Sequence, residues 1–334
     1  MPPAVALPSR RATLARLWQR FISSQEFVVL VLFSLVVVVL SLLTDEFLSR
    51  QNLTNVARNF SWIAVVAFGQ SMVIIIGGID LSVGATMALA GLTAARVMQL
   101  GVPVPVALVI GLLVGMTIGM ANGIMVARIK LPAFIVTLGT MSIARGITYG
   151  LTRGWSVINM PHSFLMLGQR DILLGGWSLP VPALVTLGLA LLIGLFLKRT
   201  VVGDYIFAMS SGERALIATG VDVVRVKVLV YTICGVLAAV GGLLMTARLG
   251  MAAPAAAMGY EVDIVAAAVI GGTSLSGGAG SILGMLLGAA ITQMFYNGLV
   301  ILNFPPYWQT MAIGTMVLVA VFLDHWQRQR QRSQ

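Results

Sequence analysis

The segment KRTVVGDYIFAMSSGERALIATGVDVVRVK, residues 198–227, is the long polar stretch on which the organisation of this chain depends. It carries charges of both signs, whereas the apolar runs on either side, Val181–Leu197 and Val228–Ala247, carry none. An apolar helix of about 20 residues is long enough to cross a bilayer, and a charged segment between two such helices belongs in water. The segment therefore predicts an aqueous loop between two membrane spans.

The composition agrees with a helical membrane protein. Of the 334 residues 58% are hydrophobic and 36 are glycine, which exceeds what a soluble core needs. The net charge of +10 comes from basic residues clustered at the ends of apolar runs, so it indicates membrane orientation rather than nucleic-acid binding. The single cysteine, Cys234, rules out a disulfide framework within the chain, and His162 and His325 have no partner at metal-ligand spacing.

Ten apolar runs divide the chain. We expect an all-α polytopic membrane protein with about ten transmembrane helices, two related halves and broken helices. The runs are Phe27–Leu43, Phe60–Ile76, one ending at Met98, one between Pro105 and Arg128, Leu131–Tyr149, Val181–Leu197, Val228–Ala247, the short Ile264–Ile270, Ile282–Leu302 and a last one through Leu323.

Charge predicts the orientation of these runs. Four arginines, Arg10, Arg11, Arg16 and Arg20, precede the first run; no small-residue cleavage site follows it, so we expect a retained span rather than a secretory signal. Ten crossings place both termini in the cytoplasm, and most of the 21 Lys and Arg residues then fall on that side. The expected parts are a cytoplasmic segment 1–26, a transmembrane domain 27–324 with the cytoplasmic loop 198–227, an external loop 150–180, and a cytoplasmic tail 325–334.

One span carries a glycine at every fourth position: Gly111, Gly115, Gly119 and Gly123. On a helix these positions form one nearly straight groove, into which a second helix backbone can pack closely. The pattern indicates helix packing and carries no chemistry.

Two distant segments form an internal sequence repeat. Ile76–Ala85 and Ile270–Ala279 agree at seven of ten positions. Glycine pairs and hydroxyls that interrupt apolar runs are typical of broken helices whose freed backbone groups line a cavity. The alternative is that the glycines only permit tight turns and the serines cap helices. The expected breaks are at Gly77, Gly78, Gly84, Gly271, Gly272 and Gly278.

Polar residues near the breaks are candidates for lining a translocation path. Asp80 is either a helix cap at the membrane interface or functional, because an unpartnered carboxylate at membrane depth is costly. Hydroxyls in membrane helices also bond their own backbone, which is the alternative for the threonines. Arg145 is expected to extend toward the outer interface. The candidates are Asp80, Ser82, Asn122, Thr137, Thr140, Thr273, Ser274 and Ser276.

Within residues 198–227 the local signals predict a short helix from Glu213 to about Thr219. Ser211 is placed to cap its N-terminus, Glu213 complements the helix dipole, and Gly220 ends it. Lying along the membrane surface, such a helix would present Leu216 and Ile217 to a partner.

Four motifs together resemble the permease subunits of bacterial ABC importers for ribose and related monosaccharides. They are GGIDLSVG at 77–84, SGERALIATGVDVVRVK at 211–227, GYEVDIVAAAVIGGTSLSGGAGSILG at 259–284 and Asn297-Gly298-Leu299, and the resemblance covers about residues 25–325. It implies a pathway formed by two permeases, this chain and either a copy or a paralogue. The resemblance also implies that a cytoplasmic ATPase dimer, which holds ATP and Mg²⁺, drives transport and that a periplasmic protein delivers the sugar.

The resemblance also implies that part of the 198–227 loop is the family's coupling helix. Here Ser210-Ser211-Gly212-Glu213 stands where relatives often have Gly-Gly-Asn-Glu, and the glutamate is kept. The residues expected to couple to the ATPase are Glu213, Arg214, Ala215, Leu216, Ala218, Gly220, Val221 and Asp222.

The chain has no GxxxxGK[ST] motif for binding ATP. We therefore expect a non-catalytic pore subunit without a cofactor or metal, embedded in the lipid bilayer of the bacterial inner membrane. An ion-gradient-driven secondary sugar transporter is the alternative, although Asp80 and Arg145 provide few intramembrane charges for coupling. An intramembrane enzyme would need a nucleophile and base within reach, and neither histidine lies inside a span. The sequence leaves open which sugar passes.

Overall fold

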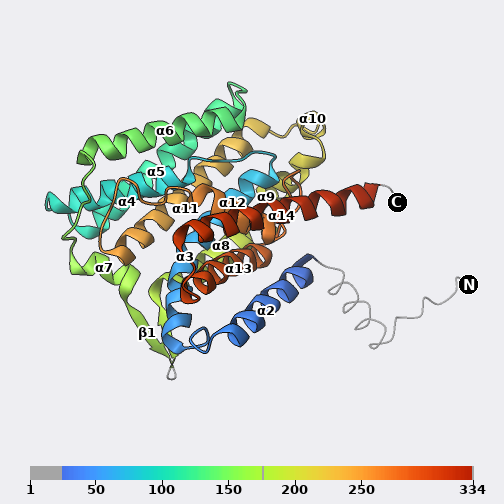
Figure 1. Ribbon diagram of the computed structural model, residues 1–334. Coiled ribbons are helices and arrows are strands. Elements are labelled where there is room, and N and C mark those ends of the chain that lie inside the picture. Colours follow the sequence, from blue (N-terminus) through green and yellow to red (C-terminus); the bar gives the residue numbers. More distant parts are fainter. Residues whose placement is uncertain (1–24, 175–176, 333–334) are drawn as a thin grey trace, which may run out of the picture.

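The computed structural model describes residues 25–174 and 177–332, which are almost entirely helical (Figure 1). Most of the expected cytoplasmic segment 1–26, including its four arginines, lies outside the described residues. The long helices are α2 (Gln25–Leu43), α3 (Arg50–Ile75), α4 (Val83–Gln99), α5 (Val104–Ala127), α6 (Ala133–Thr152), α8 (Val181–Arg199), α11 (Val223–Leu249), α13 (Ile282–Ile301) and α14 (Pro306–Arg332). The shorter elements are α7 (His162–Gln169), β1 (Asp171–Leu174), β2 (Trp177–Pro180), α9 (Val201–Ala208), the 3-10 turn η1 (Met209–Ser211), α10 (Glu213–Ala218) and α12 (Tyr260–Ile270).

Seven helices among the described residues are long and apolar enough to cross a membrane, and the prediction of a polytopic helical membrane protein is confirmed. They are Glu26–Leu43, Arg50–Ile75, Val104–Ala127, Ala133–Thr152, Val181–Arg199, Val223–Leu249 and Ile282–Ile301. The three remaining apolar runs form α4, α12 and α14, of which α12 has only 11 residues. The total of ten crossings and the relation between two halves stay predictions.

Side-chain caps determine where several helices begin. The hydroxyl of Ser49 accepts a hydrogen bond from the Asn52 N–H at the start of α3, and Ser281 does the same for Gly284 at the start of α13. The carboxylate of Asp222 accepts from the Arg225 N–H at the start of α11. Each cap satisfies one of the backbone donors that a helix N-terminus leaves free.

Helix α11 lies at the centre of the bundle and packs along α5, α3 and α4. Its closest neighbour is α5, whose glycine groove faces it. A Cβ added to Gly115 would lie 2.2 Å from the carbonyl oxygen of Gly235, and one added to Gly119 would lie 2.3 Å from that of Tyr231. Such close backbone approach is available only to glycine. The predicted packing role of the groove is confirmed.

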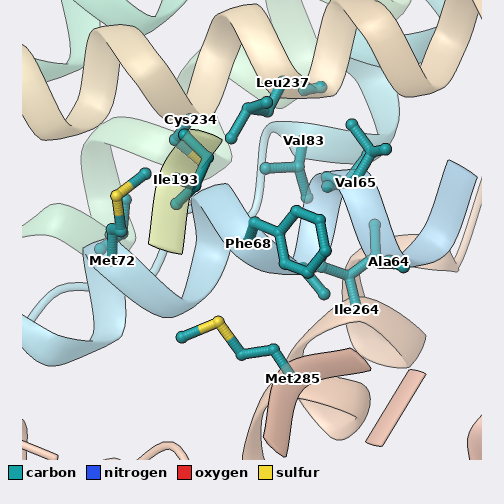
Figure 2. Packing of buried hydrophobic residues seen from close by; sticks show 14 of the residues in the cluster. Ala64, Val65, Phe68, Met72, Val83, Ile193, Cys234, Leu237, Ile264 and Met285 are labelled. Carbon is teal, nitrogen blue, oxygen red and sulfur yellow. The ribbon is translucent and has the colours of Figure 1, made fainter. Parts of the chain in front are cut away.

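Helix α3 forms the second central element, because every residue from Ser61 to Ile75 is buried. Figure 2 shows its Phe68 ring beside Ile264 of α12, in a cluster that also contains Cys234 of α11 and Met285 of α13. Residues from both ends of the chain thus share one core around α3.

The outer helices expose their apolar side chains. Helix α2 leaves Val31, Leu35 and Leu42 more than half exposed, and α8 does the same with Leu191 and Leu192. In a soluble protein such faces would be unfavourable, whereas in a bilayer they contact lipid.

Helices α2, α3 and α13 meet at a pair of asparagines. Asn52 and Asn297 exchange hydrogen bonds of 2.9 and 3.0 Å through their side-chain amides. The next residue, Gly298, packs against Leu40 of α2. This contact explains the Asn297-Gly298-Leu299 motif as a structural one.

The region between α6 and α8 is more ordered than a loop. It contains α7 and an antiparallel hairpin of β1 and β2 with Asp171 opposite Pro180, so the all-α prediction missed a small sheet. Arg58 of α3 forms an ion pair with Asp171, and the Ser178 hydroxyl donates to the same carboxylate. Burial alone raises the pKa of Asp171, but these hydrogen bonds and the nearby charges of Arg58 and Arg248 outweigh it and hold the pKa below its usual value.

Candidate functional site

The two repeated segments, Ile76–Ala85 and Ile270–Ala279, both connect helices. The first follows α3, and Gly77 turns the chain with a φ of 82° before α4 begins at Val83. The second follows α12, where Gly272 turns the chain with a φ of 87°, and α13 begins at Ile282. The break predicted at Gly84 was wrong, because Gly84 lies inside α4, whereas its counterpart Gly278 has a φ of 76° in the second connection.

The segments lie on two sides of the C-terminal end of α3. The N–H of Gly278 donates to the carbonyl of Ile75 over 3.0 Å, and Thr273 and Ser71 are joined by a 3.2 Å hydroxyl hydrogen bond. On the other side, the amide of Gln70 is oriented by its neighbours to donate to the Asp80 carbonyl and accept from the Asp80 N–H. The end of α3 therefore holds both connections in place.

Asp80 belongs to a buried polar cluster with Ser82, the N-cap residue of α4, and with residues of α5 and α6. Its carboxylate accepts from the N–H and hydroxyl of Ser82 over 2.8 and 2.6 Å, and Asn122 donates to it over 3.4 Å and to Ser82 over 3.0 Å. Thr137 donates to the carbonyl of Ile79 as well as to its own helix. Four of the candidate path residues, Asp80, Ser82, Asn122 and Thr137, thus meet in space, and all four are nearly inaccessible to solvent.

The other four candidates are not part of this cluster. Thr273 donates to Ser71 of α3, and the described hydrogen bonds of Thr140 lie within α6. Ser274 is buried and accepts from the N–H of Ser276 within the second connection, while Ser276 is exposed. The hydroxyl of Thr140 therefore does what the alternative predicted, which is to bond its own helix backbone.

Three polar residues make contacts that were not anticipated from the sequence. Gln70 and Ser71 are fully buried inside an apolar run, and their polarity in that run is the signal that could have identified them. Arg145 donates to the carbonyls of Pro254 and Ala256, each over 2.8 Å. Its guanidinium therefore satisfies backbone acceptors of the irregular connection between α11 and α12, and its expected extension toward the outer interface stays a prediction.

Replacing Asp80 tests whether the cluster is structural. Asp80→Ala removes the acceptor of three donors, and we expect it to lower the free energy of unfolding by about 2–4 kcal/mol. Asp80→Asn keeps one acceptor oxygen for Ser82, so its cost should be clearly smaller. Thermal unfolding of the two purified variants in detergent measures this, and equal losses of stability would contradict the described role of the carboxylate.

The polar segment 198–227 is mostly helical. Helix α9 packs on α8, the 3-10 turn η1 follows, and α10 covers Glu213–Ala218, close to the predicted helix. The N-cap residue of α10 is Gly212, and the side chain of Ser211, the predicted cap, lies outside the described part of the structure. Gly220, with a φ of 85°, ends the helix as predicted.

Helix α10 projects from the protein, and none of its residues is buried. Leu216 packs against the main core cluster, while Ile217 is 56% exposed. In Figure 1 the helix lies at the opposite end of the molecule from the β1–β2 hairpin. The arrangement suits a short helix that is anchored on one side and free to contact a partner on the other.

The segment also lies beside both helix connections. The Ser210 hydroxyl donates to the carbonyl of Ser276 over 3.2 Å. A cavity of about 620 Å³ separates α10 from the first connection, and it is lined by Glu213, Lys227, Tyr231, Gly77 and Gly78 among others. Residues far apart in the sequence, the predicted coupling segment and both predicted breaks, therefore lie within one region.

Comparison with known proteins agrees with this arrangement. The family model described as "Branched-chain amino acid transport system / permease component" matches residues 52–321. The chain is 39% identical over 292 residues to the ribose import permease protein of Bacillus subtilis. This alignment covers 87% of this chain and 89% of the relative. It is 36% identical over 309 residues to the ribose import permease protein of Haemophilus influenzae, covering 91% and 94% of the two chains. It is 36% identical over 285 residues to the D-allose transport system permease protein of Escherichia coli, covering 85% and 86%. No solved structure matches the chain.

Proposed function

Because the chain belongs to the permease family that includes the ribose, xylose and allose import permeases, we propose that it is the membrane-spanning subunit of an ABC importer for a monosaccharide. The substrate would be a ribose-like pentose or a related sugar. The observation that carries the proposal is the exposed helix α10 beside the first helix connection, because a partner bound to α10 would then lie close to the connection that carries Asp80.

The partners follow from this role. A cytoplasmic ATPase dimer would bind α10 and hold ATP and Mg²⁺, so this chain would be non-catalytic and need no cofactor of its own. A second permease, either a copy or a paralogue, would complete the pathway, and a periplasmic protein would deliver the sugar. The chain would lie in the bacterial inner membrane with both termini in the cytoplasm. In support, α14 ends on the same side of the molecule as α10 (Figure 1).

The polar groups near the helix connections suit an uncharged, hydroxyl-rich substrate. Ser82, Asn122, Thr137 and Thr273 offer hydroxyls and amides, which exchange hydrogen bonds with sugars without requiring a charge. We propose that the buried cluster is exposed to the path only when the connections between helices move.

An ion-gradient-driven sugar transporter is the second candidate, because Asp80 is a fully buried carboxylate. Against it, both carboxylate oxygens already accept hydrogen bonds from Ser82 and Asn122.

Reconstitution into proteoliposomes decides between these candidates. We expect sugar uptake only when the co-purified ATPase, the delivery protein and ATP are all present, because this chain has no ATP-binding motif. Omitting ATP or replacing it with a non-hydrolysable analogue is the control. Uptake by this chain alone, driven by a proton or sodium gradient, would refute the importer and support the second candidate.

A further inference from the structure

An ion pair joins α10 to α11. The Nζ of Lys227 lies 2.7 Å from Oε2 of Glu213, the first residue of α10. The Lys227 side chain is only 18% exposed, whereas that of Glu213 is 49% exposed. A partly buried pair is screened less by solvent than a surface pair, so it constrains the two helices more strongly.

A neighbouring pair provides the contrast. Asp222 and Arg225 also form an ion pair at the start of α11, at 2.8 Å, but their side chains are 50% and 88% exposed. These residues are three apart on one segment, so their pair connects no second helix. Arg225 and Lys227 lie two positions apart on α11 and thus have different partners. Of these two, only Lys227 pairs with a residue of α10.

Lys227, the α11 member of the ion pair, lies near the first helix connection, which joins α3 to α4. Lys227 and Tyr231 are four residues apart on α11, which places them on the same face of the helix. Both line the cavity that Gly77 and Gly78 also line. Gly78 lies so close to Tyr231 that an added Cβ would be 2.4 Å from its hydroxyl oxygen. Contacts therefore run from Glu213 through one face of α11 to Gly78.

We propose that the Glu213–Lys227 ion pair is the link through which a displacement of α10 reaches the α3–α4 connection. In this role Glu213 is a positioning residue within the chain, and ATPase contact is left to the exposed remainder of α10. The inference rests on the proposed importer function, because it needs an ATPase that moves α10. The cavity beside the pair provides room for that movement.

The ion pair is tested by the ratio of sugar imported to ATP hydrolysed, measured with the complete importer in proteoliposomes. Coupling between sites commonly changes an equilibrium by 5–150-fold, so we expect Glu213→Gln and Lys227→Gln each to lower the ratio by about tenfold. The ATPase should still co-purify with both variants. The exchanged variant Glu213→Lys with Lys227→Glu should recover most of the ratio, because it restores opposite charges at the same positions.

Arg225→Gln is the matched control, since it removes the same charge two positions away on α11. We expect it to leave the ratio unchanged. An unchanged ratio in Lys227→Gln, or an exchanged variant no better than the single variants, would overturn the link. Loss of ATPase association in Glu213→Gln alone would also overturn it, because Glu213 would then contact the ATPase directly. Failure of the importer function itself is recognised separately, as absence of ATP-dependent uptake by the unmodified protein.

Discussion

Replacing Gly115 with valine should prevent the accumulation of folded protein. An added Cβ at this position would lie 2.2 Å from the carbonyl oxygen of Gly235 and 2.6 Å from the Cβ of Ala239. The nearest of these atoms is backbone, so α5 and α11 would have to separate. Because α11 is the central helix, that separation would disrupt its packing on α3 and α4 as well. We expect a loss of more than about 4 kcal/mol in the free energy of unfolding.

Gly188→Val in α8 is the matched control for this change. Gly188 is exposed and has no atom within 4 Å of an added Cβ, so the same substitution should alter stability only through helix propensity. Yield after size-exclusion chromatography in detergent and the midpoint of thermal unfolding are the measurements. A Gly115→Val protein as stable as the Gly188→Val protein would show that the described α5–α11 contact is wrong.

Placing a tryptophan at Ala218 should weaken association with the ATPase strongly. Ala218 lies at the end of α10 and is exposed, so the larger side chain can be accommodated without disturbing the fold. If α10 inserts into a cleft of the partner, the indole would block that contact. Residues at the centre of an interface commonly contribute 2 kcal/mol or more, so we expect binding to weaken by at least about thirtyfold.

Val201→Trp is the control for the docking experiment. Val201 lies in the same polar segment, on α9, and is 62% exposed. Co-purification of the ATPase with each variant from detergent-solubilised membranes measures the effect. Retention of the ATPase by Ala218→Trp, or equal loss by both variants, would contradict the assignment of α10 as the docking helix.

The helices themselves were largely predictable, because each depends on local signals. Apolar runs near 20 residues became α2, α5, α8, α11 and α13, and the polar segment between two of them contains the predicted short helix. The glycine groove of α5 was recognisable from its spacing alone. The β1–β2 hairpin was missed because its short strands carry no run long enough to distinguish them from a loop.

The candidate site was only partly predictable. Three polar residues expected near the path, Ser82, Asn122 and Thr137, lie around Asp80 and its connection, but Thr140 bonds its own helix. Gln70 and Ser71 were missed because a polar residue in an apolar helix acquires a partner only when distant segments pack against it. The partner of Glu213 was missed for the same reason: Lys227 lies 14 residues away, beyond the turn that ends α10.

The sequence by itself determined that this chain is a helical membrane protein of the sugar-permease type, because hydropathy, glycine spacing and motifs are local properties of the chain. Only the tertiary structure decided which groups meet: the glycine groove with α11, both repeated connections with the end of α3, and Glu213 with Lys227. Such contacts depend on the packing of helices far apart in sequence, and residue patterns along one helix do not specify which neighbour it faces.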